Sequence, residues 1–402
     1  MTGTRILDID RRTLAVEESS PRFYDFTAVA RRYGARLARD LETVSNRCDP
    51  VADAAVNALS RLSPGRARRL IDAAATGAVD PDLEAPELLL VLLDEMTVVP
   101  DWVDAARIDR GRRAFLRAGP GGLVAAFFYS LPLEYSSPAG SKVLMLTGSL
   151  SRRAKRRLAE TGRYIAAILA PGGLEVGSPG WSITFRVRLM HAQVRRLAGN
   201  SGLWEGAWGP PINQLFMIGT SLGLPCSFSE GLPRLGWAVD EDEAEDVLFL
   251  WRYAGWLMGC DANLLPTSVD EASRMAEAIL CAQGRPDDDC RALVDAMLGA
   301  TPISWLQGKH WFRTATSDLI RRLIGDDLAD PLGLPENTGS PTYRLLRLFL
   351  AGYGGMQHVP GGGRLLTAIG GRIWEAVVRS LLAGRKPTYQ LPQRLALNRG
   401  AG

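Results

Sequence analysis

The stretch RVRLMHAQVRR, residues 186–196, contains the residues whose types and spacing are best suited to chemistry. His191, one of three histidines in the chain, lies three residues after Arg188 and four residues before Arg195. On a helix that turns about 100° per residue, two valines would lie roughly 40–60° to one side of the histidine and the two arginines roughly 40–60° to the other. The imidazole then lies on the boundary between an apolar flank and a cationic flank.

Such a helix face suits a flat, apolar ligand with a metal ion at its centre and carboxylates at one edge. Haem b has this shape: imidazole ligates the iron, apolar side chains cover the macrocycle, and arginines pair with the propionates. We therefore predict that His191 binds the iron of haem b and that Arg188 and Arg195 bind the propionates. The alternative is a histidine with an ordinary structural hydrogen bond, flanked by arginines that face solvent.

A second helix, expected over Arg153–Leu169, would supply the opposite wall. Only a short PGG…SPG connection separates it from the helix expected over Ser182–Ala198, so the two helices should be neighbours. Four of its side chains share one face and combine a guanidinium, a hydroxyl and two apolar groups: Arg157, Thr161, Ile165 and Ile168. Donors of this kind stabilise bound dioxygen, and apolar groups restrict water. An ordinary amphipathic helix pair is the alternative.

Five segments, in order along the chain, carry a resemblance to a known family: VPDWVDAARIDRG (99–111), RRLAET (156–161), RVRLMHAQVRR (186–196), GPPINQ (209–214) and GLPRLGWAVDEDEAEDVLFLWRYAGWLMGCDANLLP (231–266). The sequence resembles the DUF2236 family, which contains the latex clearing proteins and the MpaB-type oxygenases, over residues 97–282. The resemblance implies an all-α, globin-like b-haem oxygenase. It also implies that His191 is the proximal ligand, with Arg188 and Arg195 around it, and that Arg157 and Thr161 lie on the distal side.

One residue departs from the pattern of the latex clearing proteins. They carry a distal lysine beside the matching threonine, which can occupy the sixth position of the iron, and Glu160 stands at this place. Because glutamate is a poor axial ligand for haem iron, we expect a five-coordinate or water-ligated resting iron and a chemistry different from polyisoprene cleavage. Glu160 either pairs with Arg157 or turns inward and relays protons. The position of the family's distal glutamate base stays open between Glu134 and Ser141.

The composition of the 402 residues, 46% hydrophobic and 23% charged, is that of a globular protein. A net charge of +3, without long runs of like charge, predicts no nucleic-acid partner. The apolar stretch Leu123–Leu133 is too short to cross a bilayer, so no membrane partner is expected. Five widely spaced cysteines and an N-terminus without an apolar signal core favour a reduced, cytoplasmic protein.

Other residues that could form a site are weaker candidates. Cys226 lacks the loop that surrounds the thiolate ligand of P450 enzymes, so we expect a buried structural thiol. His310 and His358 could join a carboxylate in a non-haem iron site, but their spacing does not support it. The glycines at 118–122 and 360–363 complete neither a dinucleotide fingerprint nor a phosphate-binding loop.

Helical periodicity dominates the chain and indicates a single all-α domain over residues 1–402. Within it we expect a haem-binding core at 97–282, a helical cap or extension at 1–96 and additional helices at 283–402. The remaining helices are expected over these segments: Phe26–Val44, Val51–Leu62, Ala85–Glu95, Arg110–Ala118, Asp240–Gly259, Val269–Ala282, Asp287–Met297, Trp305–Ile324 and Tyr343–Gly352.

Together these observations predict a haem b-dependent oxygenase that uses dioxygen. Its substrate would be a small apolar organic molecule, isoprenoid-like or another natural product of secondary metabolism, and the reaction a hydroxylation, a desaturation or a C=C cleavage. Arg157 and Thr161 would orient and polarise the oxygen. Three alternatives remain: a latex-clearing polyisoprene dioxygenase, a non-catalytic haem protein that senses a gas, and a helical protein without a cofactor. The sequence does not indicate the electron donor, if one is required.

Overall fold

The computed structural model describes residues 23–147, 150–300, 310–336, 341–382, 389 and 391–392 and, for 150–153, the backbone alone. Within this part of the chain the secondary structure is helical, apart from one β-bridge between Tyr24 and Gln283. The all-α fold predicted from the sequence is therefore confirmed. The predicted division into a core at 97–282 with flanking extensions stays a prediction.

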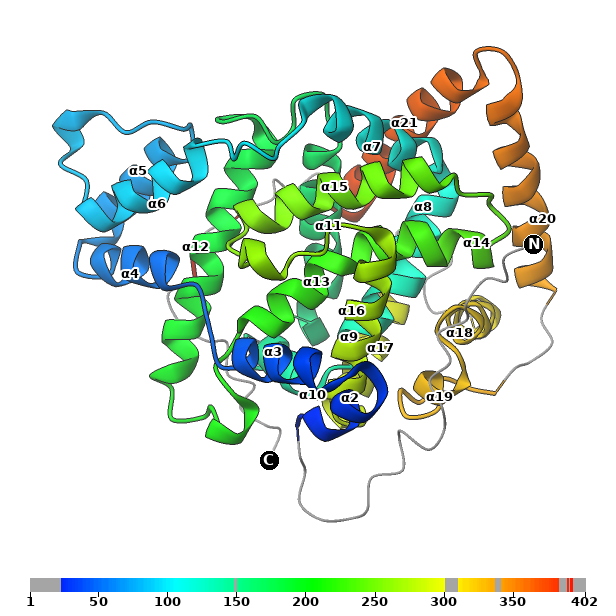
Figure 1. Cartoon of the computed structure of the whole chain (residues 1–402), viewed down its shortest axis with the longest axis horizontal. Helices are drawn as coiled ribbons and strands as arrows, with labels where there is room; N and C mark the ends of the chain where they lie inside the picture. The colour runs from blue at the N-terminus through cyan, green and yellow to red at the C-terminus, as the bar shows by residue number, and fades with distance from the viewer. Residues whose placement is uncertain are drawn as a thin grey trace.

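The first described helices form the N-terminal part of the molecule. They are α2 (Phe26–Tyr33), α3 (Ala35–Ser45), α4 (Pro50–Leu59), α5 (Pro64–Ala74) and α6 (Glu87–Thr97). Helices α4, α5 and α6 lie together at one end of the long axis (Figure 1), and α4 packs against α12. The single helix predicted over 26–44 is wrong. Gly34 has a φ of 100°, outside the helical region, so the chain bends between α2 and α3.

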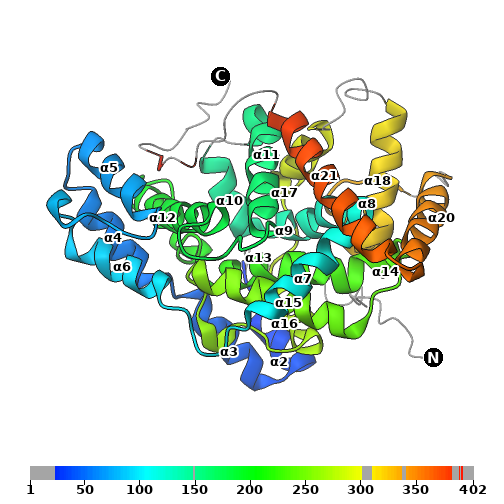
Figure 2. The same ribbon diagram turned by 90° about the horizontal axis from the view of Figure 1, so that it is seen from above.

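The central helices carry the candidate site. They are α7 (Ala105–Arg117), α8 (Gly119–Ala125), α9 (Leu131–Tyr135), α10 (Pro138–Leu146), α11 (Leu150–Ile168), α12 (Pro179–Gly199), α13 (Gln214–Cys226), α14 (Leu232–Arg234), α15 (Glu241–Leu257), α16 (Val269–Ala282) and α17 (Asp288–Gly299). As predicted, α11 packs against α12. Figure 2 shows α13 and α15 below this pair.

Two π-helical segments interrupt the central helices. One, Ala126–Ser130, joins α8 to α9, and the other, Ser227–Gly231, follows α13. The segments pack against each other, and the hydroxyl of Tyr129 donates to Glu230 Oε2 at 2.7 Å. Such π-helical turns are rare and are often found at functional sites. Here the first of them sets the direction of α9, which carries Glu134.

Helices α7 and α15 form the most extensive helix pair and are joined by buried charge. Asp246 of α15 is buried and accepts from Nε of Arg107 at 2.9 Å and from Nε of Arg110 at 2.6 Å. Asp240 caps α15 by accepting from the amide of Glu243. The helix predicted over 240–259 is thus confirmed with its ends shifted by one or two residues.

The C-terminal helices are α18 (His310–Ile324), α19 (Asp326–Ala329), α20 (Thr342–Gly355) and α21 (Gly362–Leu382). The first five residues of the helix predicted over 305–324 lie outside the described residues. The sequence pattern did not predict α21, because several glycines obscure its periodicity. The structure explains one of them: a Cβ at Gly370 would lie 1.8 Å from the carbonyl oxygen of Leu116, so only glycine allows α21 to approach α7 so closely.

Among the described residues, no single helix has the length and hydropathy needed to cross a membrane. One pair of consecutive helical stretches, Ala105–Arg117 and Gly119–Tyr135, meets the length and composition criteria together, but it is bent by 91°.

Candidate active site

His191 lies in the middle of α12, which begins after Ser178. The hydroxyl of Ser178 accepts from the amide of Trp181, and Pro179 occupies the first turn. On the two sides of His191, the α12 residues Arg188, Ala192, Val194 and Arg195 are buried. The helix therefore presents His191 from within the protein, with apolar and cationic neighbours as the sequence predicted.

The imidazole of His191 is held in its neutral form. Burial lowers its pKa to about 3, and the charges of Arg195 and Arg157 lower it further. Nδ1 is buried without a hydrogen-bond partner, whereas the residue as a whole keeps accessible surface. The accessible surface therefore belongs to other atoms of the residue. A neutral imidazole with an unpartnered nitrogen is suited to binding a metal ion.

Arg188 is a buried link between α12 and the N-terminal helices. Its Nε donates to Asp49 Oδ2 at 2.7 Å and its Nη2 to Asp49 Oδ1 at 3.1 Å. Nη2 also donates to Glu95 Oε1 of α6 at 2.7 Å. Two carboxylates thus already pair with this guanidinium. Binding of a propionate by Arg188 stays a prediction. The contacts that Arg188 makes in the structure join α12 to the N-terminal helices.

Arg195 is buried in the same way but is less fully paired. Its Nε donates to Asp53 Oδ1 at 2.7 Å, and its Nη1 donates to the carbonyl of Ile212 at 3.3 Å. Its Nη2 is buried and has no hydrogen-bond partner. One turn along α12 from His191, Arg195 therefore keeps a free donor that can bind a carboxylate.

Arg157 brings a second cation towards His191 from α11. Its Nη1 donates to Thr147 Oγ1 at 3.5 Å, a long hydrogen bond. Burial lowers the pKa of Arg157, and the nearby groups Tyr135 and Glu160 oppose this shift. Because the charge of Arg157 also lowers the pKa of His191, the structure brings these two predicted site residues together.

The other two predicted residues of α11 are placed differently. Nε of Arg156 donates to the Glu160 carboxylate at 2.9 Å, and the backbone carbonyl of Glu160 accepts from the hydroxyl of Tyr389 at 2.8 Å. The carboxylate therefore pairs with Arg156 and not with Arg157. Thr161 is exposed. The distal roles predicted for Glu160 and Thr161 stay predictions.

Glu134 contributes a carboxyl group to the same region. Burial raises its pKa to about 7, only partly offset by the hydroxyl of Ser130, which donates to Oε1 at 3.2 Å. The charge of Glu134 acts on the adjacent Tyr135, and so does the charge of Arg157. Glu134 and Arg157 therefore belong to one electrostatic cluster. Although protein surrounds it closely enough to shift its pKa, Glu134 keeps accessible surface, as His191 does.

Ser141, the other candidate position for a distal base, is buried and bonded within the fold. Its hydroxyl donates to the carbonyl of Tyr135 at 3.2 Å and lies 3.5 Å from the sulfur of Cys290. It offers no carboxylate. Of the two positions that the sequence left open, Glu134 thus supplies a group that can hold a proton near neutral pH.

Sequence reasoning missed several residues around α12. Asp49, Asp53 and Glu95, which bind the two arginines, lie far upstream and were not predicted. Asp49 had a local signal, since an aspartate before a proline is typical of a helix N-cap, and it does accept from the amide of Ala52. Tyr164 was also missed; its hydroxyl accepts from Thr184 at 3.4 Å and connects α11 to α12.

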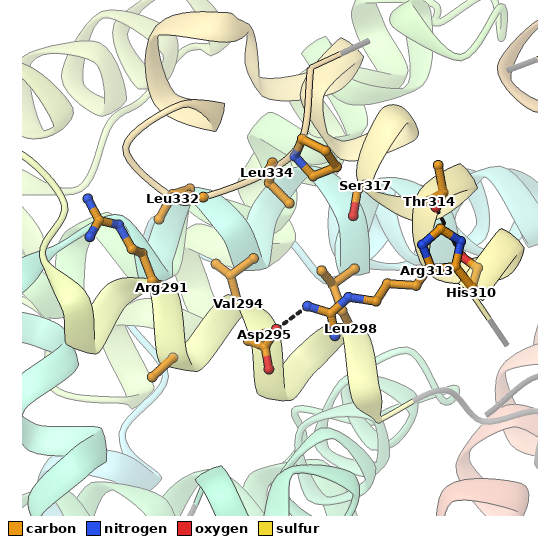
Figure 3. A pocket seen from close by; sticks show the side chains of 13 residues that line it. Arg291, Val294, Asp295, Leu298, His310, Arg313, Thr314, Ser317, Leu332 and Leu334 are labelled. Atoms are coloured by element: carbon orange, nitrogen blue, oxygen red, sulfur yellow. Dashed lines mark hydrogen bonds and ion pairs between the residues drawn. The ribbon is translucent and has the colours of Figure 1, made fainter. Parts of the chain in front are cut away.

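The weaker candidates lie outside this region. Cys226 is buried, and burial raises the pKa of its thiol well above the usual range, so the thiol stays protonated. The cysteines of the described chain are free, as predicted. His310 and His358 are exposed. A separate cavity of about 640 Å³ lies between α17, α18 and residues 332–335 (Figure 3), where His310 and an ion pair between Arg313 and Asp295 line it.

The residues around His191 fit a haem. In the described chain no group of three or more His, Cys, Asp or Glu side chains could hold a metal ion. A haem iron needs only one or two side-chain ligands, and His191 offers a neutral imidazole with an unpartnered nitrogen. The unpartnered Nη2 of Arg195 fits a propionate. The neutral imidazole and the unpartnered guanidinium nitrogen lie one turn apart on one helix, as an iron ligand and a propionate ligand of the same haem would.

Comparison with known proteins agrees with the fold and the resemblance. Residues 113–354 match the family model of the ER-bound oxygenase mpaB/B'/Rubber oxygenase catalytic domain. This match continues past residue 282, where the resemblance seen in the sequence ended. A rubber oxygenase of Streptomyces sp. (strain K30) is 24% identical over 254 residues, which cover 59% of this chain and 58% of the relative. The match thus spans less than two thirds of that protein.

A solved structure of the latex clearing protein LCP in the closed state has the same fold. The likeness has a TM-score of 0.59 at 20% sequence identity and covers 87% of this chain and 94% of the other.

Proposed function

Because the chain belongs to the family of MpaB-type and rubber oxygenase catalytic domains, we propose that it is a haem b-dependent oxygenase that oxidises a small apolar organic molecule with dioxygen. The observation that carries this proposal is His191, a neutral imidazole whose buried Nδ1 has no partner. A buried imidazole without a hydrogen-bond partner calls for an explanation, and a metal ion bound by the imidazole provides one.

His191 would hold the haem iron and Arg195 a propionate, while Arg188 anchors α12 to α4 and α6. Haem, when bound, supplies the activation of dioxygen that no side chain provides. The burial that keeps the imidazole neutral leaves its lone pair available for the metal.

The side chains on the distal side would bind and orient dioxygen and exchange protons. Arg157 is desolvated and makes one long hydrogen bond to Thr147, so its remaining N–H groups are available to an oxygen atom. Glu134, with a pKa near 7, can donate or accept a proton at neutral pH. The ion pair of Glu160 with Arg156 makes Glu134 the better candidate for the proton relay that the sequence assigned to Glu160. Thr161 would orient the oxygen.

We propose a small isoprenoid-like or other natural-product substrate, used in secondary metabolism within the cytoplasm. The support is the glutamate at position 160, where latex clearing proteins carry a lysine. A polyisoprene substrate is the alternative, because a rubber oxygenase is among the relatives.

The first experiment tests the cofactor. The purified protein should show a Soret band and, in alkaline pyridine, the spectrum of haem b. His191→Ala should lose this band, whereas His310→Ala, which changes an exposed histidine elsewhere, should keep it. Full haem occupancy in His191→Ala would refute the assignment of the ligand.

The second experiment tests the reaction. The reduced protein is incubated under labelled dioxygen with a panel of terpenoids and, separately, with polyisoprene. Label in a terpenoid product supports the proposal, and label in cleaved polyisoprene alone supports the alternative. If the haem protein labels no product on either arm, gas sensing becomes the better interpretation.

A further inference from the structure

Helix α20 exposes an apolar face. Leu345, Leu348 and Phe349 are 63%, 72% and 56% exposed, and their spacing of three and four residues places them on one side of the helix. The apolar surface continues along the chain through the exposed side chains of Met356, Val359 and Leu365. We call this set the hairpin surface, since it covers α20, the 3₁₀ turn Met356–His358 and the start of α21. Exposed apolar groups that share one helix face, as those of α20 do, mark interaction sites more often than scattered ones do.

The hairpin surface is also basic. Between Glu336 and Glu375 the sequence contains no Asp or Glu, although the whole chain has nearly equal numbers of acidic and basic residues. The same segment contains four exposed arginines: Arg344, Arg347, Arg364 and Arg372. None of these four forms an ion pair within the described part of the chain. Their charge is therefore available to a partner.

The position of α20 leaves this surface accessible. Figures 1 and 2 show α20 at the end of the long axis opposite α4, α5 and α6. Helix α20 packs mainly against α18 and against the turn Met356–His358. Only Leu350 and Gly354 of α20 are buried. The exposed apolar groups and the arginines thus lie on an outer edge of the molecule.

We infer that the hairpin surface docks on the surface of an anionic lipid bilayer. A helix with exposed leucine and phenylalanine on one face and arginines beside them is suited to the boundary between acyl chains and headgroups. Anionic headgroups would supply the negative charge that the segment lacks. This departs from the expectation of no membrane partner, which depended on the lack of a spanning segment. A peripheral site needs none.

A second copy of the chain is a poorer partner for the same surface. In a two-fold symmetric dimer the surface would meet itself. The four arginines of each copy would then approach one another without a carboxylate between Glu336 and Glu375 to pair with them. Like charges brought together in this way oppose association.

The exposed apolar residues of α6 provide a matched control. Leu88, Leu90 and Val91 are 45%, 42% and 48% exposed, but carboxylates surround them in the sequence, including Glu87 and Asp94. An anionic surface would repel this region. Both patches expose three large apolar side chains, those of α6 somewhat less than those of α20, and the two patches differ in charge.

The test is sedimentation of the full-length protein with vesicles of phosphatidylcholine, alone or mixed with phosphatidylglycerol. We expect binding to the mixed vesicles, weakened by salt, and little binding to phosphatidylcholine. The double variant Leu348→Glu with Phe349→Glu should abolish binding. Arg344→Gln and Arg347→Gln should each weaken it about fivefold. Leu88→Glu with Val91→Glu should leave it unchanged.

Two outcomes would overturn the inference. One is binding to mixed vesicles that persists in the Leu348→Glu, Phe349→Glu variant. The other is no binding at all, together with a dimer in light scattering that this variant dissociates, which would assign the surface to a second copy. Thermal melts that match the wild type show that the variants are folded.

Discussion

The two sides of His191 differ in how they accommodate buried charge. Towards α4 and α6, Arg188 is bound by the carboxylates of Asp49 and Glu95 at 2.7–3.1 Å. Towards α9 and α11, Glu134 and Arg157 are desolvated, and each has one hydrogen bond, at 3.2 and 3.5 Å, to a hydroxyl. We call these the paired side and the open side.

The difference separates structure from function. A buried ion pair that loses one partner leaves an uncompensated charge, so the paired side is needed for folding. Desolvated titratable groups without charge partners cost stability and are typical of active sites. The open side therefore has the properties of a catalytic region, and the paired side those of its support.

The largest effect is expected for Arg188→Met. This change leaves Asp49 buried without its partner and should lower the free energy of unfolding by about 3–5 kcal/mol. Arg157→Met, the matched change on the open side, removes a charge that no carboxylate binds directly, so stability should stay within about 1 kcal/mol of the wild type or rise. Urea unfolding measures both. Equal losses in the two variants would remove the distinction between the sides.

Two glycines allow a second comparison. At Gly259 a Cβ would lie 2.2 Å from Asp49 Oδ2 and 2.7 Å from Arg188 Nε, and the φ of 93° is unfavourable for alanine. We expect Gly259→Ala to cost about 2–4 kcal/mol in urea unfolding, from backbone strain and a disturbed ion pair.

At Gly223 a Cβ would lie 2.5 Å from Ser130 Oγ and 2.7 Å from Glu134 Oε1. Both are ends of side chains that can turn away, and alanine favours the helix by about 1 kcal/mol, so Gly223→Ala should cost less than Gly259→Ala. It should instead impair oxidation of substrate by displacing the carboxyl group. A larger loss of stability in Gly223→Ala than in Gly259→Ala would contradict this.

Local sequence patterns predicted the helices of the site better than the partners of its residues. Periodicity placed His191 between apolar and cationic neighbours on α12, and the short connection between the two helices paired α12 with α11. It could not assign Asp49 to Arg188, because these residues are 139 positions apart and only the packing of α4 on α12 joins them.

The sequence pattern also could not predict how α11 is rotated about its axis. Glu160 lies three residues from Arg157 and four from Arg156, and both spacings allow an ion pair on a helix. The structure selects Arg156. The outcome depends on how α11 is rotated against α12 and α21, which local sequence does not specify.

Glu134 gives the open side a pH dependence. Its pKa is about 7 in the folded protein and about 4.5 in the unfolded chain, so the folded protein binds more protons between these values. The contribution of Glu134 to the free energy of unfolding is fully present below pH 4.5. As the pH rises through 7, about 3 kcal/mol of this free energy is lost. Glu134→Gln should lack this loss and gain stability relative to the wild type as the pH rises. Parallel pH profiles in urea unfolding would show that Glu134 is not desolvated.

The smallest effect is expected for Glu160→Ala. Its ion pair with Arg156 is partly exposed, and such pairs contribute less than about 1 kcal/mol, so unfolding should change little. If Glu134 moves the proton, substrate oxidation and its pH profile should also stay near the wild type in Glu160→Ala, while Glu134→Gln loses the limb of the profile near pH 7. The reverse result, with oxidation lost in Glu160→Ala and kept in Glu134→Gln, would mean that Glu160 leaves Arg156 and turns inward during the reaction. The proton relay would then lie on α11, beside Arg157, and the desolvated carboxyl of Glu134 would need another explanation.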